Sequence, residues 1–257
     1  MSTENKSKIN QLLAQMPKGV VLLSSWLKYK GYSLDLLKKY RKSHWLESIG
    51  RGALIRSGDT IDFYGALYAL QAQAGLSVHI GGRTALSLLG KAQYLELSMS
   101  KVIVFGLKKE KLPKWLTDYD WGLKVEYYST SLFSSRLALV DLEIKEFSVK
   151  ISNPARAMME CLYLAPEHQE LSECYELMEN MNNLRPTLVQ KLLEECSSIK
   201  VKRLFLCLAE CIGHEWFGYL DIQRIDLGSG KRRIIKNGLY NSKYQITIPH
   251  GWIKHDQ

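Results

Sequence analysis

Apolar and polar positions near the start of the chain repeat at helical spacing, interrupted by helix-ending residues. The segment KSKINQLLAQMP predicts a first helix that ends at Pro17. LSSWLKYKG predicts a short second helix, with Ser24 or Ser25 as its N-cap and Gly31 at its end. Two short helices in close succession are therefore expected before residue 32.

A third helix and a hairpin follow directly. YSLDLLKKYRK predicts a helix with Ser33 as its N-cap. In WLESIGRGALIRSGD, two short extended pieces flank Gly50-Arg51-Gly52, which is a hairpin signal. Three short helices and then a basic hairpin within about 60 residues are typical of a winged helix-turn-helix domain.

The third helix separates its apolar from its charged side chains. At about 100° per residue, one arc is apolar and the other charged, with Arg41 at the boundary. The apolar arc consists of Leu34, Leu36, Leu37 and Tyr40. The charged arc consists of Asp35, Lys38, Lys39 and Lys42. In a helix-turn-helix the outer face enters the DNA major groove, and a wing follows the phosphates or the minor groove, which here would use Arg51 and Arg56. A merely solvated helix face is the alternative.

Net charge supports the first interpretation. The chain of 257 residues carries +9, and residues 1–60 account for +7 of it, with 11 Lys or Arg against 4 Asp or Glu. This asymmetry indicates an N-terminal module that faces a polyanion, and DNA, RNA and an anionic membrane all fit it. No apolar run reaches bilayer length and the N-terminus lacks a signal-peptide core, so we expect no membrane span. The order of the helices and the hairpin favours DNA among the three polyanions, so we expect no membrane partner.

The pattern of apolar and polar residues changes after a junction at 59–62. IDFYGALYALQAQAGL predicts a helix, and SVHIGGRTALSLLG an extended piece that turns through two glycines into another helix. KVIVFGL, VEYYSTSLF and FSVKI predict strands, and a run of helices begins at SNPARAMMECLYLA. We therefore expect an α+β protein: a winged-helix domain over 1–60, then a mixed domain over 61–257 with a sheet, a late helical subdomain and a basic C-terminal loop and strand.

The cysteines predict thiols rather than a metal site. The chain has five, all in the second half, in helix-like stretches and without a CxxC pair. They indicate reduced, mostly buried thiols in a cytoplasmic protein. The cluster of Cys207, Cys211 and His214 could suggest zinc, but core thiols on one helix face fit better, so we expect no metal and no cofactor.

Two glycine-containing stretches could bind anions. LGSGKRR at 227–233 lacks the first glycine and the Ser or Thr of a phosphate-binding P-loop. It leaves a basic turn with Lys231 and Arg232, which either contacts a polyanion or is simply surface. In HIGGRTAL at 79–86, Gly81-Gly82 could present backbone N–H groups to an anion, assisted by Arg83. A strand-to-helix turn that needs glycine for its backbone shape is the favoured interpretation. We find no catalytic constellation.

The whole chain resembles the AbiEi antitoxins, the regulator half of type IV abortive-infection toxin–antitoxin pairs. The resemblance rests on WLKYKGYSLDLLKKYRKSHWLESIGRGA, DFYGALYALQAQAGLSVHIGGRTALSLLG, SNPARAMMECL, VKRLFLCLAE and IDLGSGKRRIIKNGLYNSKYQITIP, in this order.

The resemblance implies a winged-helix domain that binds double-stranded DNA at inverted repeats in its own promoter and represses it. It also implies a second domain that counteracts a nucleotidyltransferase-like toxin without a stable complex. DNA-contact roles would fall on Ser33, Lys38, Lys39, Lys42, Arg51 and Arg56, and Arg83, Lys231 and Arg232 mark the second domain. Two rival hypotheses are a nucleic-acid-modifying enzyme with its active site in 61–257, and a ligand-sensing helix-turn-helix regulator.

Overall fold

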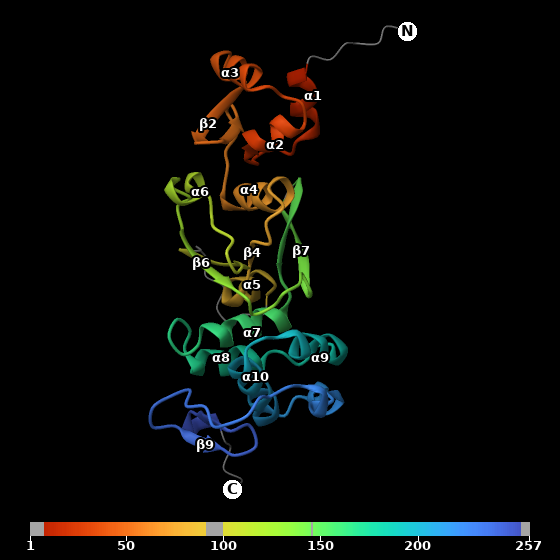
Figure 1. Ribbon diagram of the computed structural model, residues 1–257, viewed down its shortest axis with the longest axis vertical. Coiled ribbons are helices and arrows are strands. Elements are labelled where there is room, and N and C mark those ends of the chain that lie inside the picture. Colours follow the sequence, from red (N-terminus) through yellow and green to blue (C-terminus); the bar gives the residue numbers. More distant parts are fainter. Residues whose placement is uncertain (1–7, 91–99, 145, 253–257) are drawn as a thin grey trace. The chain divides into compact units, whose positions relative to one another are not determined.

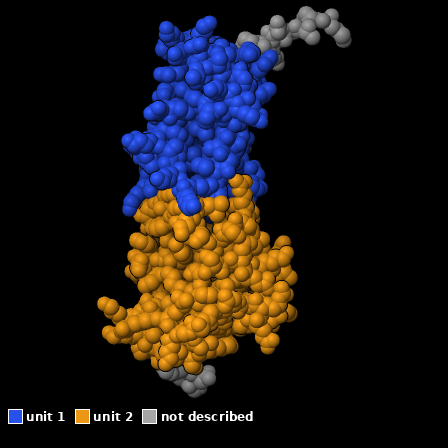
Figure 2. All heavy atoms as spheres, viewed as in Figure 1, with its two compact units in different colours: residues 1–79, 109–125, 141–150 blue, residues 80–108, 126–140, 151–257 orange. Residues whose placement is uncertain are grey.

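A computed structural model describes residues 8–90, 100–144 and 146–252 of the chain. The chain divides into two compact units (Figure 2). Unit 1 comprises residues 1–79, 109–125 and 141–150, and unit 2 comprises residues 80–108, 126–140 and 151–257. Each unit is therefore assembled from segments that are distant in the sequence.

Unit 1 begins with the winged helix-turn-helix that the sequence predicts (Figure 1). Its elements are α1 (Lys8–Gln15), β1 (Leu22–Leu23), α2 (Ser24–Tyr29), α3 (Leu34–Lys42), β2 (Leu46–Gly50) and β3 (Ala53–Arg56). The three strands form an antiparallel sheet in the order β1-β3-β2, with Leu22 opposite Leu54 and Gly50 opposite Ala53. The predicted helices and hairpin are thus confirmed, and β1 is an addition that the sequence did not indicate.

Of the serine N-caps predicted for α2 and α3, only that of α3 is confirmed. Ser33 caps α3 as predicted, because its Oγ accepts the backbone N–H of Leu36 at 3.2 Å. The prediction of a serine cap for α2 is wrong: Leu23 is the N-cap, with no side-chain bond, and Ser24 is already helical. The cause is that Leu23 belongs to β1, so the strand runs straight into the helix. Gly31 ends α2 with φ +88°, as expected.

The buried face of α3 is narrower than its apolar arc. Leu37 and Tyr40 are buried in the small core of this domain, whereas Leu34 is 56% exposed. On a helical projection Leu34 lies about 40° from Lys38 and about 20° from Arg41, so it belongs to the outer face. The prediction of a core position for Leu34 is therefore wrong.

Unit 1 also contains elements from farther along the chain. They are α4 (Phe63–Tyr68), the π-helical turn Ala69–Gln73 and α6 (Lys114–Asp118). α6, which the sequence did not indicate, packs against β2. A Cβ at Gly50 would lie 2.7 Å from the Cβ of Trp115, so only glycine permits this approach. The contact between Gly50 and Trp115 therefore packs the wing against α6.

The larger sheet has five strands within the part of the chain that the structure describes. In the order β6-β5-β4-β8-β7 these are Lys124–Thr130, Lys101–Leu107, His79–Ile80, Phe147–Ser152 and Leu139–Ile144. β4 and β8 are parallel, with Ile80 opposite Ile151. The sequence predicted all of these strands except β7.

Unit 2 holds the helical subdomain and the C-terminal hairpin. The helices are α5 (Gly82–Leu88), α7 (Pro154–Leu164), α8 (Leu171–Glu179), α9 (Pro186–Glu195) and α10 (Ile199–Ile212). α7 and α10 pack on each other, and both are rich in fully buried side chains. Unit 2 also contains short 3-10 turns at Glu215–Tyr219, Ile222–Arg224 and His250–Trp252, and the antiparallel hairpin of β9 (Leu239–Asn241) and β10 (Ile246–Ile248). The α+β class is confirmed.

Candidate nucleic-acid interface

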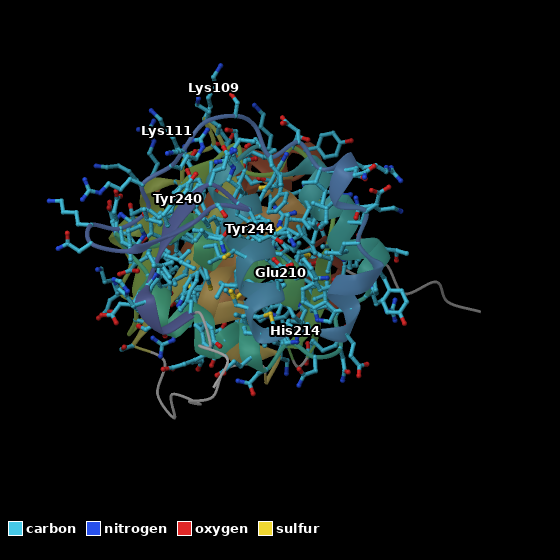
Figure 3. All side chains as sticks on the ribbon, turned by 90° about the horizontal axis from the view of Figure 1, so that it is seen from below. Lys109, Lys111, Glu210, His214, Tyr240 and Tyr244 are labelled. Atoms are coloured by element: carbon cyan, nitrogen blue, oxygen red, sulfur yellow. The ribbon has the colours of Figure 1, made fainter. Side chains whose placement is uncertain are left out.

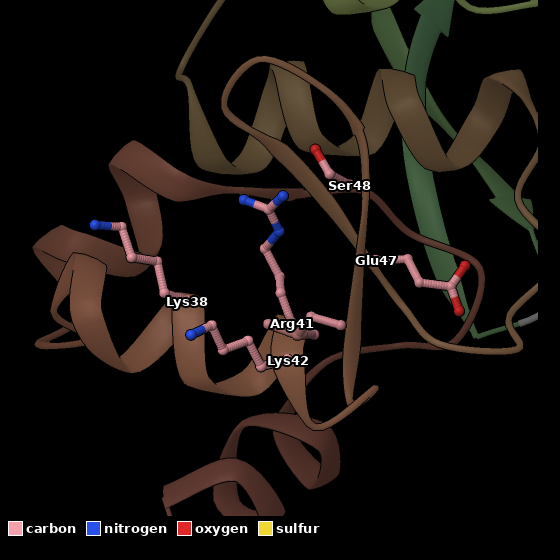
Figure 4. A pocket seen from close by; sticks show the side chains of 6 residues that line it. Lys38, Arg41, Lys42, Glu47 and Ser48 are labelled. Atoms are coloured by element: carbon pink, nitrogen blue, oxygen red, sulfur yellow. The ribbon is translucent and has the colours of Figure 1, made fainter.

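A concave surface of about 580 Å³ lies between α3 and β2 in unit 1 (Figure 4). Its lining residues are Lys38, Arg41, Lys42, Leu46, Glu47 and Ser48. Lys38, Arg41 and Lys42 rise from α3, and Arg41 extends toward the strand that carries Ser48 (Figure 4). Three cationic side chains therefore line one side of the groove. In winged helix-turn-helix domains, the helix that carries them lies in the DNA major groove.

Acidic side chains do little to neutralise this groove. Glu47 lies on the β2 side of the groove, where its carboxylate accepts a hydrogen bond from the hydroxyl of Ser57. Asp35 is 3.8 Å from the Lys38 Nζ, but the two side chains are 88% and 72% exposed. A pair so well solvated contributes little and breaks easily. Lys38 thus stays available for a phosphate.

The sequence-predicted residues of α3 divide between two flanks. Lys38 and Lys42 line the groove, and Ser33 is occupied as the helix cap, leaving its hydroxyl hydrogen free to donate. Lys39 is exposed but lies about 100° farther round the helix than Lys38, on the other flank. Arg41 was not among the predicted contacts because it sits at the boundary of the two arcs, and its position beside Leu34 was the signal that could have found it.

The two arginines of the wing lie in different environments. Arg51 is exposed at the hairpin turn, next to Gly52, which has φ +83°. Arg56, at the far end of β3, donates Nη2 to the carbonyl oxygens of Leu13 and Met16 at the end of α1. The geometry thus favours a DNA-contact role for Arg51 and a structural role for Arg56, which ties the first helix to the sheet.

In unit 2, the Gly81-Gly82 turn binds a carboxylate of the protein itself, that of Glu160. The N–H of Gly82 donates to the carboxylate of Glu160 at 3.0 Å, and Gly82 has φ +52°. A Cβ at Gly81 would lie 2.2 Å from the same carboxylate. Arg83 pairs instead with Glu173 at 2.7 Å. The interpretation as a turn that requires glycine is supported, and the backbone N–H of Gly82 is already used.

One buried arginine binds the backbone of the basic loop that contains Lys231 and Arg232. Arg203, 2% exposed on α10, donates to four backbone carbonyls around the loop. The acceptors are Leu227 at 2.7 Å, Gly230 at 2.7 Å, Gly228 at 3.1 Å and Gln245 at 3.3 Å. Lys231 lies over the exposed ring of Tyr240, 5.2 Å from its centre, and Arg232 is also exposed. The loop therefore presents its cations outward on a fixed backbone.

Within 8–90, 100–144 and 146–252, no three His, Cys, Asp or Glu side chains converge to hold a metal ion. Over the same ranges, no helix has the length and apolar character needed to cross a bilayer.

Comparison with solved structures gives a fold match. The crystal structure of the RV2827C protein from Mycobacterium tuberculosis matches 93% of this chain and 88% of its own, with a TM-score of 0.55 and 14% sequence identity. At that identity the likeness concerns the fold alone. A search of curated proteins gives no significant match.

Family models cover almost the whole chain. The model of the AbiEi antitoxin N-terminal domain matches residues 5–97, and that of the transcriptional regulator, AbiEi antitoxin of type IV toxin–antitoxin systems, matches residues 99–249. The chain therefore belongs to the AbiEi antitoxin family of transcriptional regulators.

Proposed function

We propose that this chain represses its own promoter by binding double-stranded DNA through α3 and the wing, and counteracts a nucleotidyltransferase-like toxin. The observation that carries the first part is the groove between α3 and β2, with Lys38, Arg41 and Lys42 on one side. The second part rests on the family to which the chain belongs.

The major groove of B-DNA, about 12 Å wide, admits an α-helix. With α3 in that groove, Lys38 and Lys42 meet phosphates or base edges, and Arg41 can donate two parallel hydrogen bonds to guanine. Arg51 at the wing turn reaches neighbouring phosphates or the minor groove. Ser33 at the start of the helix and Lys39 on its other flank add backbone contacts. The operator is expected to contain inverted repeats.

Functions are proposed to divide near residue 60. Residues 1–60 carry +7 of the net charge and include the whole groove, whereas residues 61–257 are nearly neutral overall. Antitoxicity is assigned to 61–257, where Arg83, Lys231 and Arg232 are candidate polar contacts. Of these, Arg83 is engaged with Glu173, so the exposed Lys231 and Arg232 are the stronger candidates. No stable complex with the toxin is required.

A gel shift with the DNA upstream of the gene tests the proposal. Replacing Lys38, Arg41 and Lys42 together with Ala should weaken operator binding by more than about 100-fold, since each contact contributes about 1–3 kcal/mol. The matched control replaces Arg185 and Lys191, exposed basic residues of unit 2, and should bind normally. Normal operator binding by the triple variant would overturn the assignment of the groove.

A further inference from the structure

The end of α10 carries two neighbouring thiols that the proposed function does not use. Cys207 and Cys211 are one helical turn apart, and their Sγ atoms are 4.0 Å from each other. Cys207 is fully buried, whereas Cys211 is partly exposed. A buried thiol and an accessible thiol therefore lie almost in contact at a helix end.

Polar groups of the C-terminal hairpin surround this pair. The amide Nδ2 of Asn241 is 3.6 Å from the Cys207 Sγ. Burial raises the pKa of the Tyr244 hydroxyl, and the nearby carboxylate of Glu210 and the two thiols raise it further. This buried hydroxyl has no hydrogen bond of normal geometry. Glu210, labelled with Tyr244 in Figure 3, is paired with Lys243. The site is thus polar as well as thiol-rich.

The two thiols differ in acidity. A hydrogen bond from Cys207 lowers the pKa of Cys211 to about 7, against the opposing effects of burial and of Glu210. The same hydrogen bond and burial raise the pKa of Cys207. Because the thiolate is the reactive form, Cys211 is the nucleophile of the pair.

The other three cysteines make a contrast within the same unit. Cys161, Cys174 and Cys196 are all buried, and burial raises the pKa of each, to about 12 for Cys174 and about 11 for Cys196. Such thiols are inert. Reactivity is therefore concentrated at one helix end.

We propose that Cys207 and Cys211 form an oxidation site, at which a hydroperoxide converts the two thiols into a disulfide bond within α10. An accessible thiolate beside a second thiol is the arrangement found at redox-sensing cysteines.

The chemistry proceeds in two balanced steps. The Cys211 thiolate attacks the outer oxygen of the hydroperoxide, the O–O bond breaks, and the leaving oxygen takes up the proton that Cys211 had released. Cys211 is now a sulfenic acid. Cys207 then loses its proton and attacks the Cys211 sulfur, so that the S–S bond forms and the S–O bond breaks. The departing hydroxide takes up that proton as water. Both sulfurs are oxidised and the hydroperoxide is reduced.

The disulfide also changes local structure. Residues one helical turn apart have Cβ atoms about 5–6 Å from each other, whereas a disulfide needs about 3.5–4.5 Å. The last turn of α10, which ends at Gly213 with φ +84°, must therefore shift when the disulfide forms. The same shift removes the contact between Cys207 and Asn241 of β9.

Peptide mapping by mass spectrometry tests the proposal on the full-length reduced protein treated with hydrogen peroxide. The wild type should lose two hydrogen atoms and yield a peptide cross-linked between Cys207 and Cys211. Cys207→Ser should instead accumulate a sulfenic acid on Cys211, trapped by dimedone, and Cys211→Ser should give neither product. Cys161, Cys174 and Cys196 are internal controls, oxidising more than about tenfold more slowly.

Three results would overturn the proposal. They are equal oxidation of all five cysteines, unchanged oxidation of Cys207 in Cys211→Ser, and a tightly held thiophilic metal ion that protects the pair. Cys207→Ala repeats the trapping experiment without a hydroxyl in the core. Amide hydrogen exchange should accelerate in the last turn of α10 on oxidation, and unchanged exchange there in a cross-linked sample would exclude the structural shift.

Discussion

The carboxylate of Glu160 accepts the backbone N–H of Gly82 at 3.0 Å, although 78 residues separate them in the chain. The same carboxylate accepts the Ser152 hydroxyl at 2.8 Å and pairs with Arg156 Nε at 3.0 Å. The segments HIGGRTAL and SNPARAMMECL are therefore two halves of one buried contact. This buried charge therefore joins the two segments in the interior of unit 2.

Breaking that contact should destabilise the protein strongly. Glu160→Gln keeps the side-chain shape but leaves the buried Arg156 without its counter-charge, which should cost about 3–5 kcal/mol of unfolding free energy. Urea denaturation of the full chain measures the loss. Glu179→Gln, an exposed acid on α8, is the control and should stay within about 0.5 kcal/mol of wild type. Equal stabilities for the two variants would remove the structural role of Glu160.

Two leucines on the same helix should respond differently to truncation. Leu37 is 4% exposed and Leu34 is 56% exposed, so Leu37→Ala leaves a cavity and Leu34→Ala does not. We expect Leu37→Ala to destabilise the winged helix by about 2–5 kcal/mol, as core leucines do. Leu34→Ala should cost less than about 0.5 kcal/mol. Thermal unfolding checks both, and comparable losses would mean that α3 is rotated about its axis.

Operator binding should depend steeply on salt. If about five basic groups meet phosphates, log affinity falls with log salt with a slope of about −4 to −5. The five groups proposed are Lys38, Lys39, Arg41, Lys42 and Arg51. Lys42→Ala should reduce the slope by about 1, measured by fluorescence anisotropy at several salt concentrations. A slope near zero for the wild type would contradict binding through these residues.

Local chemistry made the N-terminal domain predictable. The cap at Ser33, the stop at Gly31 and the hairpin around Gly50–Gly52 all follow from interactions between near neighbours in the sequence. The two residues of β1 could not be found this way, because they form a strand only by pairing with β3. α6 is likewise short and depends on its packing against β2.

Buried charges were the hardest features to predict. Arg203 and Glu160 lie in helices whose polar residues are expected at the surface, yet both are almost fully buried. Arg203 donates to backbone carbonyls at least 24 residues away, and Glu160 meets the backbone of Gly82 78 residues away. Only the pairing of Glu160 with Arg156, at i,i+4 spacing, could be read from the local pattern. The groove was predicted only in part for a related reason: Arg41 sits at the edge of its helix face, and β2 decides which flank is hollow.

Alkylation of Cys211 should depend on pH near neutrality. The thiolate reacts and the thiol does not, so the rate should rise as pH increases through about 7 and level off above it. Among the described residues, the ionisable groups that lie near the pair include Glu210, Lys243, Tyr244 and Tyr175. In Cys207→Ala the thiolate loses the hydrogen bond from the Cys207 S–H that stabilises it, so the midpoint should move to higher pH. Mass-resolved iodoacetamide labelling measures both curves, and coincident midpoints would show that Cys207 does not tune its neighbour.

Repression and antitoxicity should be separable in the intact chain. A cut after residue 60 would part β2 from α6, whose Trp115 lies against Gly50, so full-length variants are the better test. The variant lacking Lys38, Arg41 and Lys42 should fail to repress a promoter reporter, because the groove loses its three cations. It should still protect cells from the cognate toxin, since unit 2 is unchanged. Lys231→Ala with Arg232→Ala should show the reverse pattern, because these side chains are exposed on the loop that Arg203 holds. If protection disappears with the α3 cations while the protein remains folded, the chain neutralises its toxin only through DNA.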